Sequence, residues 1–435
     1  MLVEFSIKNF RSFKDKTTFS MQTAPYLKKH KDTNTFQFPS MNLLKNAVIF
    51  GPNGSGKSNV FEGMATLRDL ITNFAAPKGR GIPKLPHQPF KMHDSNENSD
   101  TEFEVILHLD KILYQYIVSF NENQINYESL SILKKSKDEC LFIREYDQEE
   151  DTYHYWLSSK VNDFRNLTRK NILYLSILNQ FNDTHAINIV NWFLEDLQIV
   201  RTNYELKHYG HLLDRLAEDK NLKDNVVRLL RVADYNIIDL ELKEKRQKIP
   251  GFIKEYFEYD DEEEFIEYTD VFTVYNRFDS NGELLGATSL HADSFESRGT
   301  KKMIIIAVIL LDALQRGKTL LMEEFDSAFH LAISKFLMKL FNTKLYNKSS
   351  QFILNTHEVS LLDNDILRVD QIWFVEKDKD NNSDLYSLYD FNDANDRPRS
   401  DITYANDYLK GKFGAYPVIN NHVFDYNFLH RSEDE

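Results

Sequence analysis

Residues 51 to 58 read GPNGSGKS, a spacing of glycine, lysine and serine that can hold a chain of phosphates. Small residues let backbone N–H groups converge on phosphate oxygens, and the start of a following helix adds partial positive charge. Lys57 would reach the outer phosphates and Ser58 would bind Mg²⁺. We therefore predict an ATP and Mg²⁺ site in this loop. Its residues are Gly51, Asn53, Gly54, Ser55, Gly56, Lys57, Ser58 and Asn59.

Two adjacent carboxylates follow a second apolar run. The strand expected over Thr319 to Met322 delivers Glu323 and Glu324 at its carboxyl end, where ligands sit in open α/β sheets. Glu323 would hold Mg²⁺, directly or through water, and Glu324 would orient the attacking water and accept its proton. Alone, such a pair would more often be surface charge, but the phosphate loop in the same chain favours the catalytic role.

Two further segments can contribute polar groups to the same chemistry. Ser297 and Gly299 precede the long apolar helix expected over Met303 to Leu314, where they could bind an anion or simply cap the helix. His357 follows the apolar strand expected over Phe352 to Asn355. A lone histidine is more often structural, but one at this strand end could hydrogen-bond a γ-phosphate.

The elements that must position these residues can be predicted from periodicity. The strand Asn46 to Phe50 feeds into the glycine-rich turn, and helical spacing of apolar residues predicts a helix from Lys57 to about Phe74. Short alternating runs predict N-terminal strands at Leu2 to Phe10 and Thr17 to Met21.

The middle of the chain changes period twice. An exposed loop over residues 76 to 100 is followed by an antiparallel meander, and the pattern becomes helical from about Ser158 to Asp234. The acidic run Asp260 to Glu264 is expected to be a solvated loop, and Asn281-Gly282 is expected to turn a hairpin over Val271 to Leu290. The meander strands are Glu102 to Leu109, Leu113 to Phe120 and Ile125 to Ile132, and the helices include His185 to Val200 and Leu222 to Ala233.

Composition limits the class of protein. The 435 residues can form two or three units, and the formal net charge of −14 argues against wholesale coating of nucleic acid. The single cysteine, Cys140, cannot form an internal disulfide, which favours a cytoplasmic protein. The longest apolar run, Met303 to Leu311, is too short to span a bilayer, which needs about 20 residues. We therefore expect no membrane partner.

The order of these motifs resembles the ABC-type ATPases of the SMC and RecF kind. Their stand-alone bacterial relatives, the RloA-like, PARIS-type and abortive-infection ATPases of the AAA family, are more similar still. The resemblance rests on FSIKNFRSF, GPNGSGKSN, ESRGT, LLMEEFDSAFH, NTHE and KGKFGAYP, which span nearly the whole chain. The phosphate loop is generic, whereas the later motifs in this order are specific.

The resemblance implies a role for further residues. Ser297 and Gly299 would bind the γ-phosphate held by a second subunit, and His357 would sense that phosphate. Asp326 and Ser327 would lie in a loop at the dimer interface. Residues that would complete the nucleotide and metal sites are Arg11, Ser12 and, as a metal-sensing glutamine, Gln88.

The chain departs from the family pattern in three ways. Glu323 stands where the family has aspartate, which can still hold Mg²⁺ through water but would slow turnover. Arg298 occupies a glycine-type position of the ESRGT motif and could add positive charge near the phosphate. The long coiled coil of SMC proteins is missing, because the helical segment shows no sustained heptads.

The resulting fold expectation is an α/β P-loop NTPase of the ABC and SMC-head type. It would combine a mixed β-sheet with an antiparallel β subdomain and an inserted helical lobe. The expected divisions are an N-terminal ATPase lobe over residues 1–157, the inserted helical lobe over residues 158–235 and a C-terminal ATPase lobe over residues 236–435.

The expected function is a Mg²⁺-dependent ATPase whose ATP holds a homodimer or higher oligomer together. It would act as sensor and scaffold of a bacterial antiphage system, triggered by DNA or a phage protein and working through a separate effector, either a nuclease or a toxin. The alternative is a RecF-like or SMC-like DNA repair ATPase, with a basic groove drawn from Lys78, Arg80, Lys84, Lys134, Lys135 and Lys137. A small-molecule kinase would have no use for ESRGT. A fused nuclease built on Glu376, Asp378 and Asp380 is disfavoured, because VEKDKDNN is typical of a strand running into a turn.

Overall fold

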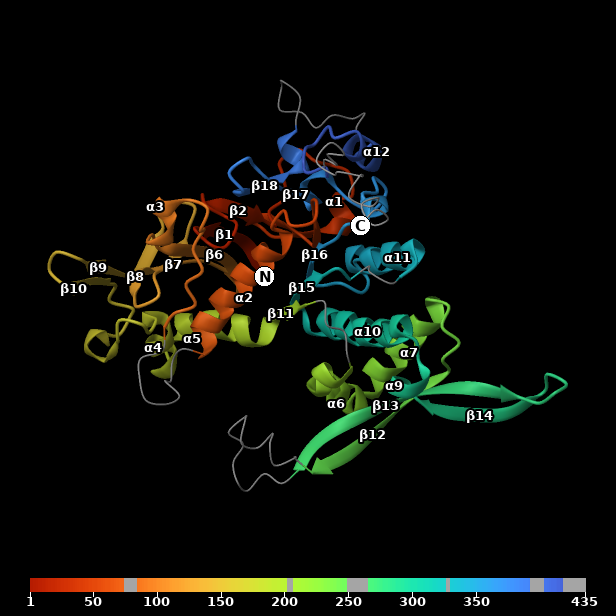
Figure 1. Ribbon diagram of the computed structural model, residues 1–435. Coiled ribbons are helices and arrows are strands. Elements are labelled where there is room, and N and C mark those ends of the chain that lie inside the picture. The colour runs from red at the N-terminus through yellow and green to blue at the C-terminus, as the bar shows by residue number, and fades with distance from the viewer. Residues whose placement is uncertain (74–83, 202–205, 249–264, 326–328, 392–402, 418–435) are drawn as a thin grey trace, which may run out of the picture.

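In the computed structural model, the chain forms two large β-sheets, and a smaller three-stranded sheet projects from the helical side of the molecule (Figure 1). The structure describes residues 1–73, 84–201, 206–248, 265–325, 329–391 and 403–417. The acidic run Asp260 to Glu264 lies outside these ranges, as do Asp326 and Ser327, which were expected at a dimer interface.

The larger sheet is antiparallel and confirms the expected meander. Its strands alternate between buried and more exposed residues, as a sheet with one face on a core requires. Two strands that were not predicted from the sequence, β9 and β10, extend it. In spatial order the sheet contains β10 (Thr152–Leu157), β9 (Glu139–Asp147), β8 (Ile125–Leu133), β7 (Ile112–Phe120), β6 (Thr101–Leu109), β1 (Leu2–Lys8) and β2 (Thr17–Ser20).

The second sheet carries the predicted nucleotide-binding motifs. Its first five strands run parallel and are almost wholly buried, as near-continuous apolar strands between two layers must be. Strand β18 pairs antiparallel at the edge. The spatial order is β11 (Leu197–Val200), β15 (Thr319–Glu323), β16 (Gln351–Asn355), β5 (Asn46–Phe50), β17 (Ile372–Lys377) and β18 (Ser383–Ser387).

Two cores lie on the opposite faces of this parallel sheet. Ala47 and Ile49 of β5 belong to a core shared with α2 and the antiparallel sheet, whereas Val48 and Phe50 face a core shared with α10 and α11. Because successive side chains of β5 point to opposite faces of the sheet, this one strand contributes to both cores. Among the described residues, the helices with at least six residues are α2 (Lys57–Asn73), α4 (Tyr174–Gln180), α5 (Thr184–Asn191), α6 (Gly210–Glu218), α7 (Lys220–Val232), α10 (Arg298–Arg316), α11 (Leu331–Asn342) and α12 (Tyr404–Leu409).

Smaller elements complete the fold. The expected hairpin at Asn281-Gly282 is confirmed, with Gly282 at φ 83°. It forms part of a three-stranded sheet that projects from the body (Figure 1), made of β12 (Asp239–Lys248), β13 (Phe265–Phe278) and β14 (Leu284–His291). Apart from single turns of 3-10 or π type, the other short elements of the described ranges are β3 (Thr35–Gln37), β4 (Asn42–Leu44), α1 (Lys31–Asn34), α3 (Asp94–Glu97) and α9 (Ala292–Phe295).

The prediction of one helix over His185 to Val200 is wrong at its end. Helix α5 stops at Asn191, a single π-type turn covers Trp192–Asp196, and Leu197–Val200 forms β11 beside β15. The apolar residues of WFLEDLQIV fit the period of a helix and that of a strand. The edge of β15 supplies backbone hydrogen bonds, which stabilise the strand. The divisions at residues 158 and 235 stay a prediction, but the middle segment contributes a strand to the parallel sheet.

Candidate nucleotide site

The phosphate loop lies between β5 and α2, at the carboxyl edge of the parallel sheet. Its glycines allow close approach: a side chain at Gly51 would meet the Val375 carbonyl, and one at Gly56, with φ 112°, would meet the hydroxyls of Ser12 and Ser383. The loop is therefore packed against both β17 and β18. The cavity above it has a volume of about 250 Å³ and is lined by Asn53, Gly54, Gly56, Lys57, Ser58, Asn59, Glu324, Asn355 and His357.

Lys57 is buried at the first position of α2. Its Nζ donates to the carbonyls of Gly51 at 2.8 Å and Pro52 at 2.9 Å, so the ammonium is held inside the loop. Burial lowers the pKa of Lys57 to about 8, and Glu324 opposes that shift. An anion entering the cavity would meet this cation and the N-terminus of a long helix, which is an arrangement suited to phosphate.

Glu323 and Ser58 meet beside the phosphate loop. Glu323 is buried at the end of β15, and burial raises the pKa of its carboxyl although a hydrogen bond from Ser58 lowers it. Glu62 and Glu324 raise it further through their charge. A hydroxyl and a carboxylate in contact, with two more carboxylates near, form an oxygen set that suits Mg²⁺. The residues present thus fit the expected cation.

Glu324 takes an unusual backbone conformation with its side chain at the cavity. Its φ is 43°, a left-handed value that is uncommon outside glycine. The Glu324 N–H faces two oxygens of Asn355, the carbonyl at 3.2 Å and Oδ1 at 3.0 Å, while its carbonyl accepts from Lys302 Nζ at 3.0 Å. Groups from β16 and α10 therefore fix this peptide from two sides.

His357 lies where the sequence places it, two residues beyond β16, and its exposed side chain lines the cavity. The intervening Thr356 is buried and its N–H donates to the Ile49 carbonyl of β5 at 3.2 Å. The strand end is thus anchored while the imidazole faces the cavity. Lys57 at the start of α2, Glu324 directly after β15 and His357 shortly after β16 therefore share one cavity.

The N-terminal residues Arg11 and Ser12 contact the outer side of the phosphate loop helix. Ser12 Oγ accepts from Asn59 Nδ2 at 2.7 Å, and Arg11 approaches Asn59 and Glu62. Gln88 does not line the cavity, because its side chain accepts from Arg11 Nε at 2.8 Å instead. None of the three lines the cavity: Arg11 and Ser12 contact Asn59 of α2, and Gln88 contacts Arg11.

Ser297 and Gly299 do not line the cavity of their own chain. Ser297 is exposed and caps α10, accepting from the Thr300 N–H at 3.1 Å, as the simpler sequence interpretation expects. In this geometry the Ser297 hydroxyl can contact a phosphate only if that phosphate belongs to a ligand outside the chain's own cavity.

Four residues beside the site, Asn355, Lys302, Arg201 and Glu62, were not predicted from the sequence. Asn355 and Lys302 hold the Glu324 peptide, while Arg201, directly after β11, binds Glu62 of α2 at 2.8 Å. Arg201 lowers the pKa of Glu323. The signal for Asn355 is its place at a strand end in NTHE. Arg201 was hidden because β11 was taken for a helix.

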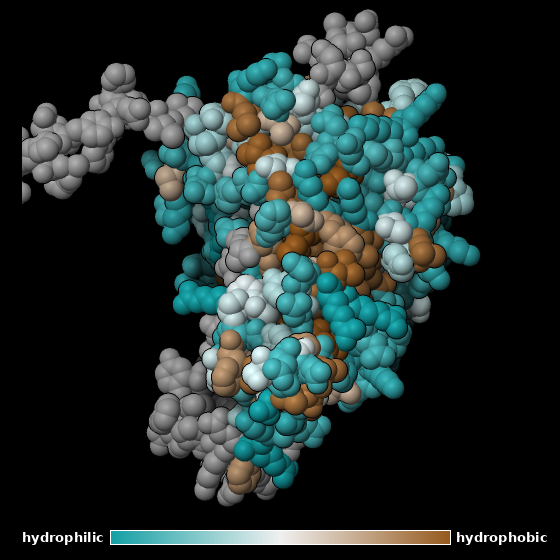
Figure 2. All heavy atoms as spheres, turned by 90° about the vertical axis from the view of Figure 1, so that its right-hand side faces the viewer, coloured by the Kyte–Doolittle hydropathy of each residue, from teal (hydrophilic) through white to brown (hydrophobic). Residues whose placement is uncertain are grey.

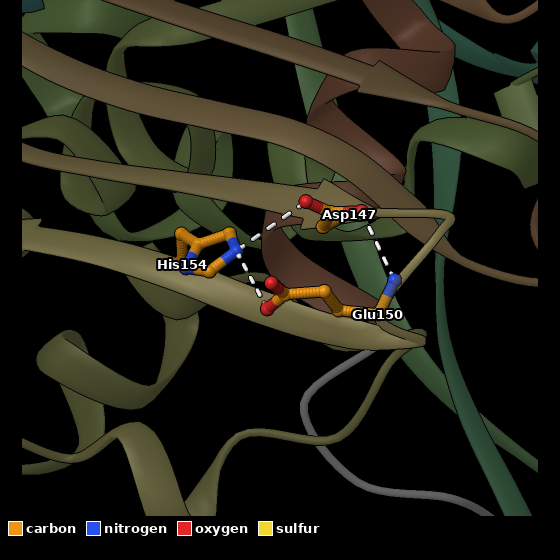
Figure 3. A group of neighbouring side chains, drawn as sticks. All are labelled: Asp147, Glu150 and His154. Atoms are coloured by element: carbon orange, nitrogen blue, oxygen red, sulfur yellow. Dashed lines mark hydrogen bonds and ion pairs between the residues drawn. The ribbon is translucent and has the colours of Figure 1, made fainter.

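A second group of ligand-type side chains lies on the β9–β10 hairpin, in a different part of the molecule (Figure 3). His154 Nε2 stands 3.5 Å from Asp147 and 3.4 Å from Glu150, and Asp147 also accepts from the backbone of the turn. Surface ion pairs and turn hydrogen bonds account for this group.

Other expectations concern basic and acidic surface residues. Of the expected DNA groove, Lys78 and Arg80 lie outside the described residues, whereas Lys84 and Lys134 form ion pairs with Glu122 and Glu139. Lys135 and Lys137 are exposed. Glu376 belongs to β17 and accepts from the Ala415 N–H, and Asp378 closes the turn after it, so the prediction of a strand running into a turn is confirmed.

The parallel sheet, phosphate loop and strand-end carboxylates define a P-loop nucleotide-binding protein of the α/β class. The chain belongs to the family described as "AAA domain, putative AbiEii toxin, Type IV TA system", whose model matches residues 47–363. No curated protein matches the chain. No helix in the described ranges has both the length and the apolar character needed to cross a membrane.

Solved structures of SMC heads are similar to the chain. One is described as the SmcHead bound to the C-winged helix domain of ScpA, with 15% identity, 89% of this chain and 97% of that chain covered, and a TM-score of 0.43. Another is the SMC head domain from Thermotoga maritima, with 14% identity, 89% and 98% covered, and a TM-score of 0.36.

Proposed function

We propose that this chain is an ATPase that requires Mg²⁺. The observation that carries the proposal is the single cavity in which Lys57, Glu324 and His357 meet above the phosphate loop. Family membership supports a nucleotide as the ligand.

Each residue has a distinct role in this proposal. Lys57 and the N-terminus of α2 hold the phosphates, and Ser58 with Glu323 holds Mg²⁺, which supplies charge neutralisation when bound. Glu324 orients a water molecule and accepts its proton, and His357 donates a hydrogen bond to the terminal phosphate. Arg11 and Ser12 support the loop through Asn59.

The proposal extends to a dimer held together by ATP. Ser297 and Gly299 stand at the exposed start of α10, outside their own cavity, so a second subunit could present its phosphate to them. Under this proposal ATP binding creates the interface and hydrolysis releases it. The family description names a toxin system. The role proposed for this chain within such a system is that of sensor and scaffold in antiphage defence. The effector, a nuclease or toxin, would be a separate polypeptide, and DNA or a phage protein would be the trigger.

Light scattering of the Glu324→Gln variant tests the dimer. Its mass should double with ATP and Mg²⁺, whereas Lys57→Ala should not respond. A Glu324→Gln protein that binds ATP and stays at one mass would refute the ATP-held dimer. For the defence role, deletion in the native host should raise phage plaque counts, and the wild-type chain, but not Lys57→Ala, should reverse the change.

The purified chain, given ATP and Mg²⁺, should cut neither DNA nor RNA. Glu376 is already bound to Ala415 and Asp378 to its own turn, so these carboxylates are engaged in structure. Incubation with labelled plasmid and single-stranded RNA checks this. Cleavage that disappears in Asp378→Asn would replace the separate effector with a fused one.

The alternative function is a DNA clamp. No contact made by the described lysines favours it, but DNA binding by the purified chain that weakens with salt would support it.

A further inference from the structure

Helices α7, α10 and α11 enclose an apolar groove away from the nucleotide cavity. Its volume is about 500 Å³, twice that of the cavity above the phosphate loop. Leu229 and Val232 come from α7, Leu311 and Leu314 from α10, and Phe336 and Leu340 from α11. Apolar side chains gather in the middle of this side of the molecule, bordered by hydrophilic ones (Figure 2).

The groove leaves large apolar side chains in water. Val232 is 64% exposed and Tyr346, just beyond α11, is 61% exposed. Covering such surface is favourable by about 25 cal/mol for each Å² removed from water. Contiguous apolar surface of this kind marks sites of association.

The charged residues of the lining share one sign. Arg228 stands on α7 and Lys339 on α11, and the lining contains no carboxylate. Neither cation has an ion pair within the described residues. A partner that covers the apolar floor would therefore gain from acidic groups at its edges. A two-fold contact of this groove with a second copy would instead bring cations close to cations.

We propose that the groove binds an amphipathic helix of a partner protein, with an apolar stripe flanked by acidic residues. The partner helix would pack on the apolar floor between α7, α10 and α11, with its axis about 8–10 Å from theirs, as packed helices lie. Helix-in-groove recognition uses apolar anchors at positions i, i+3, i+4 and i+7.

The groove is connected to the nucleotide site through α10. The same helix starts at the Ser297 cap and carries Lys302, which binds the Glu324 carbonyl. A ligand on Leu311 and Leu314 would thus touch the helix that contacts the proposed catalytic carboxylate. Under the proposed function this partner would be the separate effector; that assignment rests on the proposed function, whereas the binding itself does not.

A synthetic peptide tests the groove directly. The probe is a fluorescent helical peptide with leucines at i, i+3, i+4 and i+7 and flanking glutamates, titrated against the full chain by anisotropy. We expect saturable binding that weakens about tenfold or more in Val232→Glu. Leu284→Glu, at an equally exposed apolar residue of β14, is the matched control and should bind normally. A peptide with the leucines scrambled off the stripe should bind poorly.

A charge exchange separates specific docking from general stickiness. Arg228→Glu with Lys339→Glu should weaken the glutamate-flanked peptide about tenfold and strengthen a lysine-flanked one. Three results would each refute the proposed docking site: an equal loss of peptide affinity in Leu284→Glu, an unchanged affinity in Val232→Glu, or no change of preference between the two peptides in the charge-reversed variant. So would ATP-independent dimerisation of the chain that Val232→Glu abolishes, because the groove would then hold a second copy.

The two proposals can fail separately. Lys57→Ala should lose ATP hydrolysis and keep peptide binding. A wild-type chain that binds the peptide but hydrolyses no ATP would refute only the ATPase, and one that hydrolyses ATP but does not bind the peptide would refute only the docking site.

Discussion

Glu324 shows how a single backbone conformation can aim a reactive group. Its left-handed φ of 43° turns the chain out of β15, so that the buried Glu323 and the exposed Glu324 face different surroundings although they are adjacent. Such strained conformations persist where neighbouring groups fix them, and here Asn355 and Lys302 do so. The proposed division of roles between the two carboxylates rests on this turn.

Glu324→Gln should therefore keep ATP binding and lose hydrolysis by about 100-fold or more, because an amide can hold water but cannot accept its proton. Glu323→Gln should instead weaken the response to Mg²⁺, since its carboxylate contacts Ser58. Nucleotide titration and phosphate release measure both variants. If Glu323→Gln spares binding and stops turnover while Glu324→Gln disturbs the Mg²⁺ response, the two roles are reversed.

Lys57 gives the site a dependence on pH. Burial lowers its pKa to about 8 in the free protein, so its charge is present below that pH and is lost as the pH rises. Bound phosphates stabilise the charged form, and ATP affinity should fall as the pH rises above about 8, by up to tenfold for each unit. Calorimetry near pH 8 should show uptake of about half a proton on binding. Lys57→Met should bind weakly, without this dependence; an unchanged slope would point to another group.

At the scale of elements, α10 links three features of the molecule. It starts at the Ser297 cap, runs through the second core and forms the floor of the groove. Its buried Lys302 donates to the Glu324 carbonyl. A movement of this helix would therefore shift the position of the proposed general base, Glu324.

Lys302→Met should lower the rate of ATP hydrolysis by about 10 to 100-fold with little change in ATP affinity, because the Glu324 peptide loses one of its supports. Lys302→Arg keeps a donor and should recover part of the rate. Turnover and nucleotide titration distinguish this from misfolding, which would reduce both. A variant with normal turnover would limit Lys302 to a packing role.

Much of the site could be predicted because it follows strands. The residues after β5, β15 and β16 stand in sequence beside clear apolar runs, so Lys57, Glu324 and His357 could be expected at one sheet edge. Arg201 could not, because β11 is short and its residues also fit a helix until the β15 edge is known. Lys302 was hidden for another reason: its contact with Glu324 depends on how α10 packs, which periodicity does not give.

At the scale of the whole molecule, the parallel sheet separates two cores and places the nucleotide cavity at one edge. Ser297 lies outside that cavity, and a composite site between two subunits would use it. In such a site the phosphate loop of one subunit and Ser297 of the other hold the same ATP. A lesion in either residue would then damage both sites of a homodimer, although each subunit has only one change.

Mixing two damaged subunits tests the composite arrangement. Lys57→Ala and Ser297→Arg should each be inactive alone, whereas the mixed dimer, isolated by two affinity tags, places both lesions in one site and leaves the other wild type. Activity should partly return. Ser297→Asn, which keeps a capping oxygen for the Thr300 N–H, shows whether loss of the α10 cap accounts for the defect. Because hydrolysis can require both sites together, nucleotide occupancy and ATP-dependent mass are measured beside turnover. If each subunit works by itself, every site in the mixture keeps one lesion, and a verified mixed dimer that binds no ATP would remove the ESRGT segment from the nucleotide site.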